Sequence, residues 1–251
     1  MIGPLPASGH LRELSPPGED PVRTIVCLPF AGGSATSYRR LVPLLPPRVR
    51  LLAAQLPGRQ DRFGTPPLRE LHAATASLSG ELRELPPGPL TLFGHSMGAL
   101  LAWEIANLLR DEAAAPDVVI ATGTDAPDTR AGIDPTILFS DQDELAALGG
   151  IDPALLANER TREFVARPLR ADLEMLARVS TWSPGPVPGQ LHVLGGADDQ
   201  HVPLNNLLAW RDRQPGATVR LLAGGHFFIW DHLPLIVSLA MGSADEGGPR
   251  C

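Results

Sequence analysis

The sequence lacks lysine altogether, and all 21 of its basic residues are arginines. This absence excludes a Walker A phosphate-binding loop and any Schiff-base mechanism, because both depend on a lysine amine. Acidic residues outnumber the arginines and give a formal net charge of −7 at pH 7. The negative charge, together with the lack of interleaved aromatic and basic residues, argues against a nucleic-acid partner.

Cysteines are scarce, and long hydrophobic runs are missing. Cys27 lies in an apolar, strand-like segment and Cys251 is the last residue, so we expect two reduced thiols and no disulfide framework. No apolar run approaches the roughly 18 residues of a transmembrane helix, and the N-terminal segment has no signal-peptide core. We therefore expect a cytoplasmic protein without a membrane partner.

Metal-binding patterns are missing as well. His10, His72, His192 and His201 show no repeated metal-ligand spacing, so we expect no zinc site and no other metal site. His232 precedes the last apolar segment and is expected at the surface. We predict that the protein requires no cofactor.

The most informative feature that is present is the run Gly94-His95-Ser96-Met97-Gly98. It follows the apolar segment Leu90–Phe93 and precedes the helix-like segment Ala99–Ala106, which is the context of a nucleophile elbow. In such an elbow the serine occupies a strained turn that exposes its hydroxyl, and small flanking glycines avoid collisions with the strand and the helix. The Met97 amide would lie at a helix N-terminus, where it can bind an oxyanion. The alternative is a glycine-flanked loop serine, and His95 is expected to pack or to form hydrogen bonds locally.

A base and an acid follow downstream, in the order expected for an α/β-hydrolase. The strand-like segment Val219–Leu222 leads to Gly-Gly-His226, and His226 is the candidate base because an unperturbed imidazole titrates near neutrality. The strand-like segment Leu191–Leu194 leads to an acidic turn that contains Asp198 and Asp199. We favour Asp199 as the acid and leave Asp198 open, while the alternative for His226 is a loop residue that caps a turn.

A second oxyanion donor is expected after the first strand of the hydrolase fold. The strand-like segment 23–29 leads into Phe30-Ala31-Gly32-Gly33, where small residues allow a backbone amide to approach a substrate. Ala31 is the candidate partner of Met97 in the oxyanion hole. A flexible glycine-rich loop is the alternative interpretation.

Strand-like and helix-like segments alternate along most of the chain, which predicts a mostly parallel sheet with helices on both faces. Residues 1–21 are expected to form a flexible leader, residues 22–241 the α/β domain, and residues 242–251 a disordered tail. Strands are predicted over 23–29, 50–56, 90–94, 117–123, 191–194 and 219–222, and helices over 36–46, 68–85 and 97–110.

Five stretches spread over nearly the whole chain resemble type II thioesterases, the stand-alone editing hydrolases of polyketide synthases and nonribosomal peptide synthetases. They are Leu28–Gly33, Gln55–Arg62, Gly94–Ala99, Leu169–Asp172 and Gly224–Phe228. The resemblance implies an α/β-hydrolase fold, a triad of Ser96, Asp199 and His226, and an oxyanion hole of Ala31 and Met97. It also implies hydrolysis of acyl thioesters on the phosphopantetheine arm of an acyl or peptidyl carrier protein, which would remove aberrant or stalled acyl groups. A general carboxylesterase or lipase, and a non-catalytic binding protein of the same fold, are the alternatives.

Residues about 130–185 interrupt the alternation and are predicted to form a helical lid inserted into the domain. Ser140 is expected to cap one helix, and Pro168 to open a second one that carries Leu169, Leu173 and Leu176. The apolar face of this second helix would cover an acyl chamber beside Ser96. The alternative is an ordinary amphipathic helix packed on the sheet.

Arginines are frequent in the lid and in one early loop. They could form a basic rim that docks an acidic carrier protein, or they could be solvated or paired with acids such as Glu159 and Glu163. These arginines are Arg59, Arg62, Arg160, Arg162, Arg167, Arg170 and Arg178.

Overall fold

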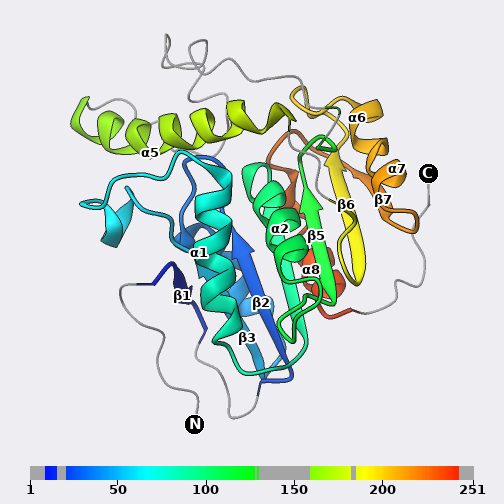
Figure 1. Ribbon diagram of the computed structural model, residues 1–251. Helices are drawn as coiled ribbons and strands as arrows, with labels where there is room; N and C mark the ends of the chain where they lie inside the picture. Colours follow the sequence, from blue (N-terminus) through cyan, green and yellow to red (C-terminus); the bar gives the residue numbers. More distant parts are fainter. Residues whose placement is uncertain (1–8, 16–20, 128, 130–158, 182–184, 243–251) are drawn as a thin grey trace.

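The computed structural model describes residues 9–15, 21–127, 129, 159–181 and 185–242 (Figure 1). Its centre is a seven-stranded sheet with the strand order β1-β3-β2-β4-β5-β6-β7, in which only the β1–β3 pair is antiparallel. The strands are β1 (Leu11–Glu13), β2 (Arg23–Leu28), β3 (Val49–Ala54), β4 (Leu90–His95), β5 (Val118–Thr122), β6 (Gln190–Gly196) and β7 (Thr218–Leu222). The mostly parallel sheet predicted from the alternating pattern is confirmed.

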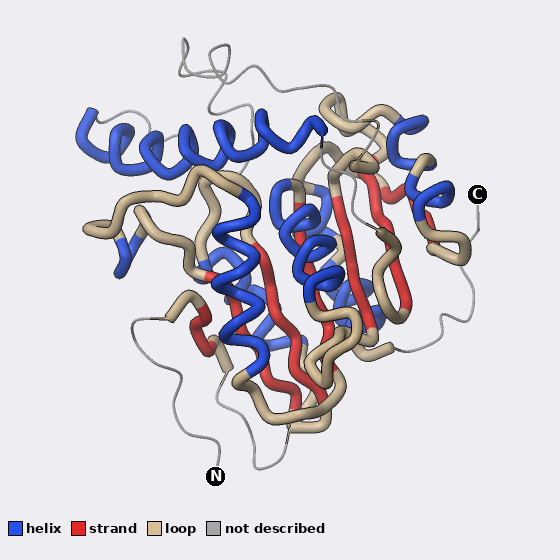
Figure 2. The backbone as a smooth tube through the Cα atoms, viewed as in Figure 1, coloured by secondary structure: helices blue, strands red, loops and turns tan. Residues whose placement is uncertain are grey.

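Helices cover both faces of this sheet (Figure 2). Successive residues of a strand point to opposite faces, so Val26 and Leu28 pack with the helices α1, α2 and α5, whereas Ile25 and Cys27 pack with η1 and α8. This burial on both sides explains the nearly continuous apolar sequence of the central strands. The longer helices are η1 (a 3₁₀ helix, Ala35–Leu44), α1 (Leu71–Arg83), α2 (Met97–Leu108), α5 (Glu159–Ala177) and α8 (Leu233–Ala240).

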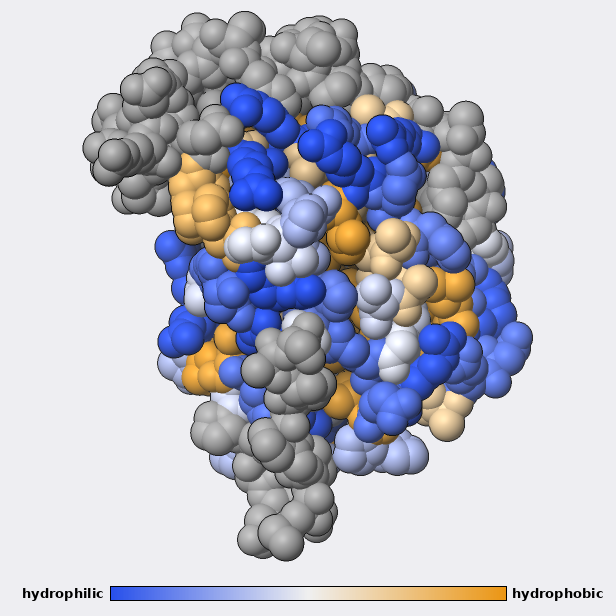
Figure 3. Space-filling view, turned by 60° about the vertical axis from the view of Figure 1, so that its left-hand side comes forward, coloured by the Kyte–Doolittle hydropathy of each residue, from blue (hydrophilic) through white to orange (hydrophobic). Residues whose placement is uncertain are grey.

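Shorter helical segments complete the described part of the chain, and the sequence patterns did not predict them. They are η2 (Gln60–Arg62), η4 (Arg178–Thr181), α6 (Leu204–Leu208), α7 (Trp210–Arg213) and η5 (Phe228–Asp231). No helix among the described residues is long and apolar enough to cross a membrane. Hydrophobic residues on the face shown in Figure 3 occur in small patches that hydrophilic residues separate.

The expectation of a flexible leader over residues 1–21 is wrong for Leu11–Glu13, which form strand β1. Leu11 is buried in the core, and its amide donates a hydrogen bond to the Glu81 carboxylate of α1 at 3.0 Å. Glu13 pairs with the buried Arg50 of β3 at 3.1 Å. These contacts fix an edge strand that is too short to show a periodic pattern. Residues 1–8, 16–20 and 243–251 lie outside the described part, as do the predicted cap Ser140 and the rest of 130–158.

The expectation that Pro168 opens a helix is also wrong, because Pro168 lies inside α5. Proline lacks the amide of a helical hydrogen bond and is therefore common in a first turn, but tertiary packing supports the helix on both sides of it here. Leu169, Leu173 and Leu176 are buried in the core cluster with α1 and α2. The apolar face of α5 therefore packs on the domain, and its Leu169 side chain also lies 3.3 Å from where a Cβ on Gly32 would be.

Candidate active site

The six parallel strands, β2 to β7, all end at the same edge of the sheet, which is uppermost in Figure 1 and is called the upper edge here. Every residue predicted to take part in the site follows one of these strand ends, which is where open parallel sheets build their binding sites. The opposite edge, where these strands begin, is called the lower edge.

Ser96 occupies the turn between β4 and α2 with backbone angles of φ 53° and ψ −116°. A non-glycine residue with positive φ is strained, and the Ser96 amide is held by a hydrogen bond of 2.7 Å to the carbonyl of Thr122 on β5. A Cβ on Gly94 would lie 2.0 Å from the Gly98 carbonyl oxygen, and a Cβ on Gly98 would lie 2.1 Å from the Leu28 carbonyl oxygen. The steric role predicted for the two glycines is confirmed.

Asp199, and not Asp198, faces His226. The Asp199 carboxylate is fully buried, and its Oδ2 lies 2.8 Å from His226 Nδ1, while Asp198 is exposed to solvent. Burial of Asp199 would raise its pKa, but the hydrogen bonds from His226 and from the His201 amide outweigh that effect and lower the pKa below its ordinary value. Asp199 is therefore ionised near neutrality, so His226 Nδ1 carries the proton and donates it. His226 Nε2 is left as the basic nitrogen.

His95 packs against His226 and forms a local hydrogen bond, as the sequence led us to expect. The two rings are 5.0 Å apart, and His95 Nδ1 lies 3.0 Å from the Thr122 hydroxyl. Because that hydroxyl donates its own proton to the Gly94 carbonyl at 3.1 Å, Nδ1 of His95 is the donor in this pair. Complete burial lowers the pKa of His95, and repulsion from His226 lowers it further. His95 is therefore neutral near pH 7, and its ring is tilted by 47° relative to the His226 ring.

Gly123 allows the two imidazoles to approach one another, and sequence reasoning missed it. Its φ is 59°, and a Cβ at this position would lie 2.5 Å from His95 Cε1 and 3.5 Å from His226 Cε1. The residue directly follows β5 and is the last residue of the strand predicted over 117–123, so its place at a strand end could have suggested a role at this edge. No motif identifies it.

The segment Phe30–Gly33 forms a tight turn beside the elbow. The Gly33 amide donates to the Phe30 carbonyl at 2.8 Å, and Gly32 has a φ of 75°, which is the geometry of a type II turn. The Phe30 ring lies 4.9 Å from the Phe227 ring, next to His226, so the turn and the imidazole face one region. Met97 is the first residue of α2. The end of β2 lies close to this first turn, because Gly98 packs against the Leu28 carbonyl. The structure thus brings both predicted oxyanion residues to the upper edge.

The early-loop arginine Arg59 is buried and does not belong to an exposed basic rim, so the alternative expectation, that these arginines pair with acids, holds for it. Its side chain is 4% exposed and forms a buried ion pair with Asp172 of α5 at 2.8 Å. Arg178 pairs with Glu70, and Arg167 lies 5.3 Å above the ring of Phe63. The side chains of Arg160 and Arg162 lie outside the described part.

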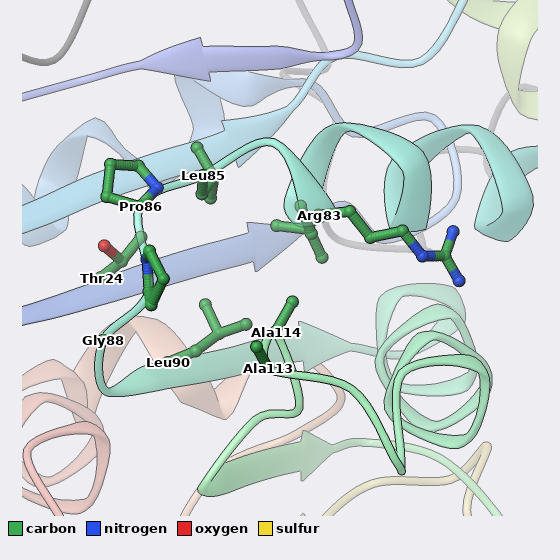
Figure 4. A pocket seen from close by; sticks show the side chains of 10 residues that line it. Thr24, Arg83, Leu85, Pro86, Gly88, Leu90, Ala113 and Ala114 are labelled. Atoms are coloured by element: carbon green, nitrogen blue, oxygen red, sulfur yellow. The ribbon is translucent and has the colours of Figure 1, made fainter.

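Among the described residues there is no cluster of three histidine, cysteine, aspartate or glutamate side chains that could hold a metal ion. A cavity of about 60 Å³ lies at the lower edge, between the starts of β2 and β4, and is lined by Thr24, Leu85, Pro86, Leu90 and Ala114 (Figure 4). It is separated from Ser96 by the length of the sheet, so it is not a chamber for the same chemistry.

The thioesterase-domain family matches the chain over residues 23–241. A probable cadicidin biosynthesis thioesterase of Streptomyces griseus is 33% identical over 92% of this chain and 64% of its own length. Thioesterase PikA5 of Streptomyces venezuelae is 30% identical over 88% of this chain and 80% of its own. Phenyloxazoline synthase MbtB of Mycobacterium tuberculosis is matched over only 16% of its length.

Solved structures agree with the family match. The type II thioesterase BorB from the borrelidin biosynthetic cluster superimposes with a TM-score of 0.79 and 30% identity, over 93% of this chain and 96% of that chain. The fold is therefore that of the α/β-hydrolases, and the chain belongs to the thioesterase family.

Proposed function

We propose that the protein is a serine thioesterase that hydrolyses acyl groups from the phosphopantetheine arm of an acyl or peptidyl carrier protein. The observation that carries the proposal is the hydrogen bond of 2.8 Å between the buried Asp199 carboxylate and His226 Nδ1. It lies at the same edge of the sheet as Ser96, which occupies a strained turn. Membership of the thioesterase family supports a thioester rather than an oxygen ester as the substrate. The names of its relatives, from cadicidin and borrelidin biosynthesis, support a role in such a biosynthetic pathway. The role that we propose there is the removal of aberrant or stalled acyl units in the cytoplasm.

Acylation would begin when His226 Nε2 takes the proton of the Ser96 hydroxyl and Ser96 Oγ attacks the thioester carbonyl carbon. The negative charge then develops on the carbonyl oxygen, where the Ala31 and Met97 amides would donate hydrogen bonds. The carbon–sulfur bond breaks, and the imidazolium gives its proton to the departing pantetheine thiolate. The acyl group is left as an ester on Ser96.

Deacylation would use the same groups. His226 takes a proton from water, the hydroxide attacks the ester carbonyl, and the second tetrahedral intermediate occupies the same oxyanion hole. The bond to Ser96 Oγ breaks, Ser96 regains a proton from His226, and the free carboxylic acid leaves. Asp199 orients His226 and stabilises its positive charge in both half-reactions, and the chemistry requires no cofactor.

The test is to compare three substrates, an acylated carrier protein, the matching acyl-pantetheine and a p-nitrophenyl ester, with wild type and Ser96→Ala. We expect release from the carrier protein to be the fastest and to fall by at least about 10³-fold in Ser96→Ala. Ser238→Ala, which alters an exposed serine on α8, is the matched control and should behave as wild type.

Two outcomes would change the assignment. Turnover of the oxygen ester alone would indicate a general esterase. No turnover of any substrate, together with no labelling of Ser96 by a fluorophosphonate, would indicate a binding protein built on the hydrolase fold.

A further inference from the structure

Hydrogen bonds join three segments that are distant in sequence: the Phe30–Gly33 turn, the loop that contains Arg59, and the helix α5. The Gly32 amide donates to Asp172 Oδ2 of α5 at 2.8 Å. Arg59 donates to both oxygens of the same carboxylate, at 2.8 Å each, and also to the Gly33 carbonyl at 2.9 Å. One carboxylate and one guanidinium therefore hold the turn at an amide and at a carbonyl.

The charges in this cluster are almost entirely removed from water. The Arg59 side chain is 4% exposed and the Asp172 side chain is 0% exposed. A buried carboxylate is costly unless its oxygens are paired, and here they accept three charge-assisted hydrogen bonds. Such bonds have strict geometry, so they fix the position of the Gly32 amide more narrowly than apolar packing would.

The geometry of the turn determines what this fixation does. A turn closed by a bond from its fourth residue to its first leaves the amides of the second and third residues free to point outward. The third is Gly32, whose amide is used by Asp172. The second is Ala31, the proposed oxyanion donor, and the peptide that follows Ala31 carries the Gly32 amide. The Ala31 amide itself lies in the preceding peptide, whose Phe30 carbonyl accepts the closing bond from Gly33. With one neighbouring peptide held by that bond and the other by Asp172, the Ala31 amide is restrained on both sides.

The other end of the same loop is fixed by a second buried side chain. Gln55 Oε1 accepts from the Ala35 amide at 2.9 Å, and Gln55 Nε2 donates to the Arg59 carbonyl at 3.1 Å. Arg59 is thus itself placed by a residue that anchors the start of η1. The loop from Phe30 to Ala35 is held by polar bonds at both ends.

We propose that Asp172, with Arg59 as its counter-ion, is a positioning residue for the oxyanion hole. Its carboxylate holds the Phe30–Gly33 turn so that the Ala31 amide faces the oxygen that becomes negative during thioester hydrolysis. The proposal rests on the proposed function, which assigns Ala31 to the oxyanion hole. It also makes the seating of α5 on the domain a condition for full activity.

The chain offers a matched control for this cluster. Asp117 at the lower edge likewise accepts two hydrogen bonds from an arginine, Arg23, and one from a backbone amide, that of Leu90, at 2.6–2.9 Å. Asp117→Asn therefore removes the same chemistry far from Ser96. An effect of losing the arginine–aspartate hydrogen bonds as such would appear in both variants. The Asp117 side chain is 47% exposed, so the effect of leaving a buried charge unpaired is controlled separately, by the double variant below.

The experiment measures kcat and KM for an acylated carrier protein, and the rate of Ser96 labelling by a fluorophosphonate, in wild type, Asp172→Asn and Asp117→Asn. We expect Asp172→Asn to lower kcat by about 10²-fold with KM changed less than about twofold, because displacement of a catalytic group by about 1 Å has that effect. Labelling should slow in parallel, since it passes through a similar charged intermediate. Asp117→Asn should match wild type in all three.

A double variant, Arg59→Met with Asp172→Leu, keeps the proposal testable if the single variant does not fold, because it leaves no unpaired buried charge. We expect it to fold and to show the same loss of kcat. Wild-type kcat in either variant, or a loss confined to KM, would overturn the positioning role.

Failure of the positioning role is distinguishable from failure of the proposed function. If turnover depends on Ser96 but not on Asp172, the positioning role alone is overturned. If wild type neither turns over a thioester nor labels at Ser96, the proposed function is overturned and the positioning role falls with it.

Discussion

Two arginine–aspartate pairs of the same design lie at opposite edges of the sheet. Asp172 at the upper edge and Asp117 at the lower edge each accept two hydrogen bonds from an arginine and one from a backbone amide. Asp172 is fully buried, whereas the Asp117 side chain is 47% exposed. The lower pair joins the starts of β2, β4 and β5, which the ladder hydrogen bonds of the sheet already hold in register.

The contrast shows where this fold depends on polar side chains. At the lower edge water can replace a lost hydrogen bond, and the ladder keeps the strands aligned without it. At the upper edge the chain leaves the sheet, so the turn at Phe30–Gly33 has no ladder hydrogen bonds, and its own closing bond and the buried pair supply the polar contacts that hold it. An arginine–aspartate pair therefore adds little to the order of the lower edge, whereas under our proposal the upper edge needs its pair to position the turn.

The largest difference between the edges is expected for two glycine substitutions. Gly98→Ala would place a Cβ 2.1 Å from a backbone oxygen at the upper edge, whereas a Cβ on Gly88 at the lower edge meets nothing within 4 Å. We expect Gly98→Ala to cost at least about 4 kcal/mol or to prevent folding, and Gly88→Ala to change stability by less than about 1 kcal/mol. Urea denaturation of the two variants measures this. Equal stability of both would show that the elbow can relax more than its contacts suggest.

An intermediate difference is expected for the two aspartates. Asp172→Asn leaves the Arg59 charge buried without its counter-ion and should lower the free energy of unfolding by about 3–5 kcal/mol. Asp117→Asn affects a half-exposed pair and should lower it by less than about 1 kcal/mol. Denaturant melts at pH 7 test both variants side by side. A small loss for Asp172→Asn would mean that water reaches Arg59 in the variant.

The smallest difference concerns the pH dependence of stability, to which the buried His95 contributes at the upper edge. Burial lowers the pKa of His95 in the folded protein, so below pH 6.5 or so the unfolded chain binds a proton that the folded chain does not. Stability should therefore fall as the pH falls from 7 to 5, by up to about 1.4 kcal/mol per pH unit from this residue. In His95→Gln that part of the slope should disappear. Identical slopes in the two proteins would show that His95 is not the source.

The sequence predicted the elements with strong periodic or motif signals. The elbow, the parallel strands and the helix α2 follow from apolar runs that glycines or prolines bound, and their bounds differ from the prediction by a few residues. The edge strand β1 has three residues and was missed, because so short a segment has no period. Pro168 was misplaced because the local preference of proline for a first turn was outweighed by packing of α5 on both sides of it.

The candidate site shows the same division. Ser96 and His226 follow strands and could be found from their neighbours, but the choice between Asp198 and Asp199 depends on which way adjacent side chains point, and only the three-dimensional arrangement decides it. Arg59 and Asp172 carry no local signal of a pair, since they are 113 residues apart. The sequence therefore left open whether Arg59 belongs to a basic rim, is solvated or pairs with an acid.

The separation of these residues also sets an order of assembly. The Gly32–Asp172 bond spans 140 residues, so the turn near the beginning of the chain acquires its final support only after α5 has been synthesised and has docked. A nascent chain that ends before α5 already contains Ser96 and its elbow. Under our proposal it would still lack a fixed oxyanion amide, as well as Asp199 and His226, so Ser96 would not become a working nucleophile until α5, β6 and β7 had all been synthesised and had joined the domain.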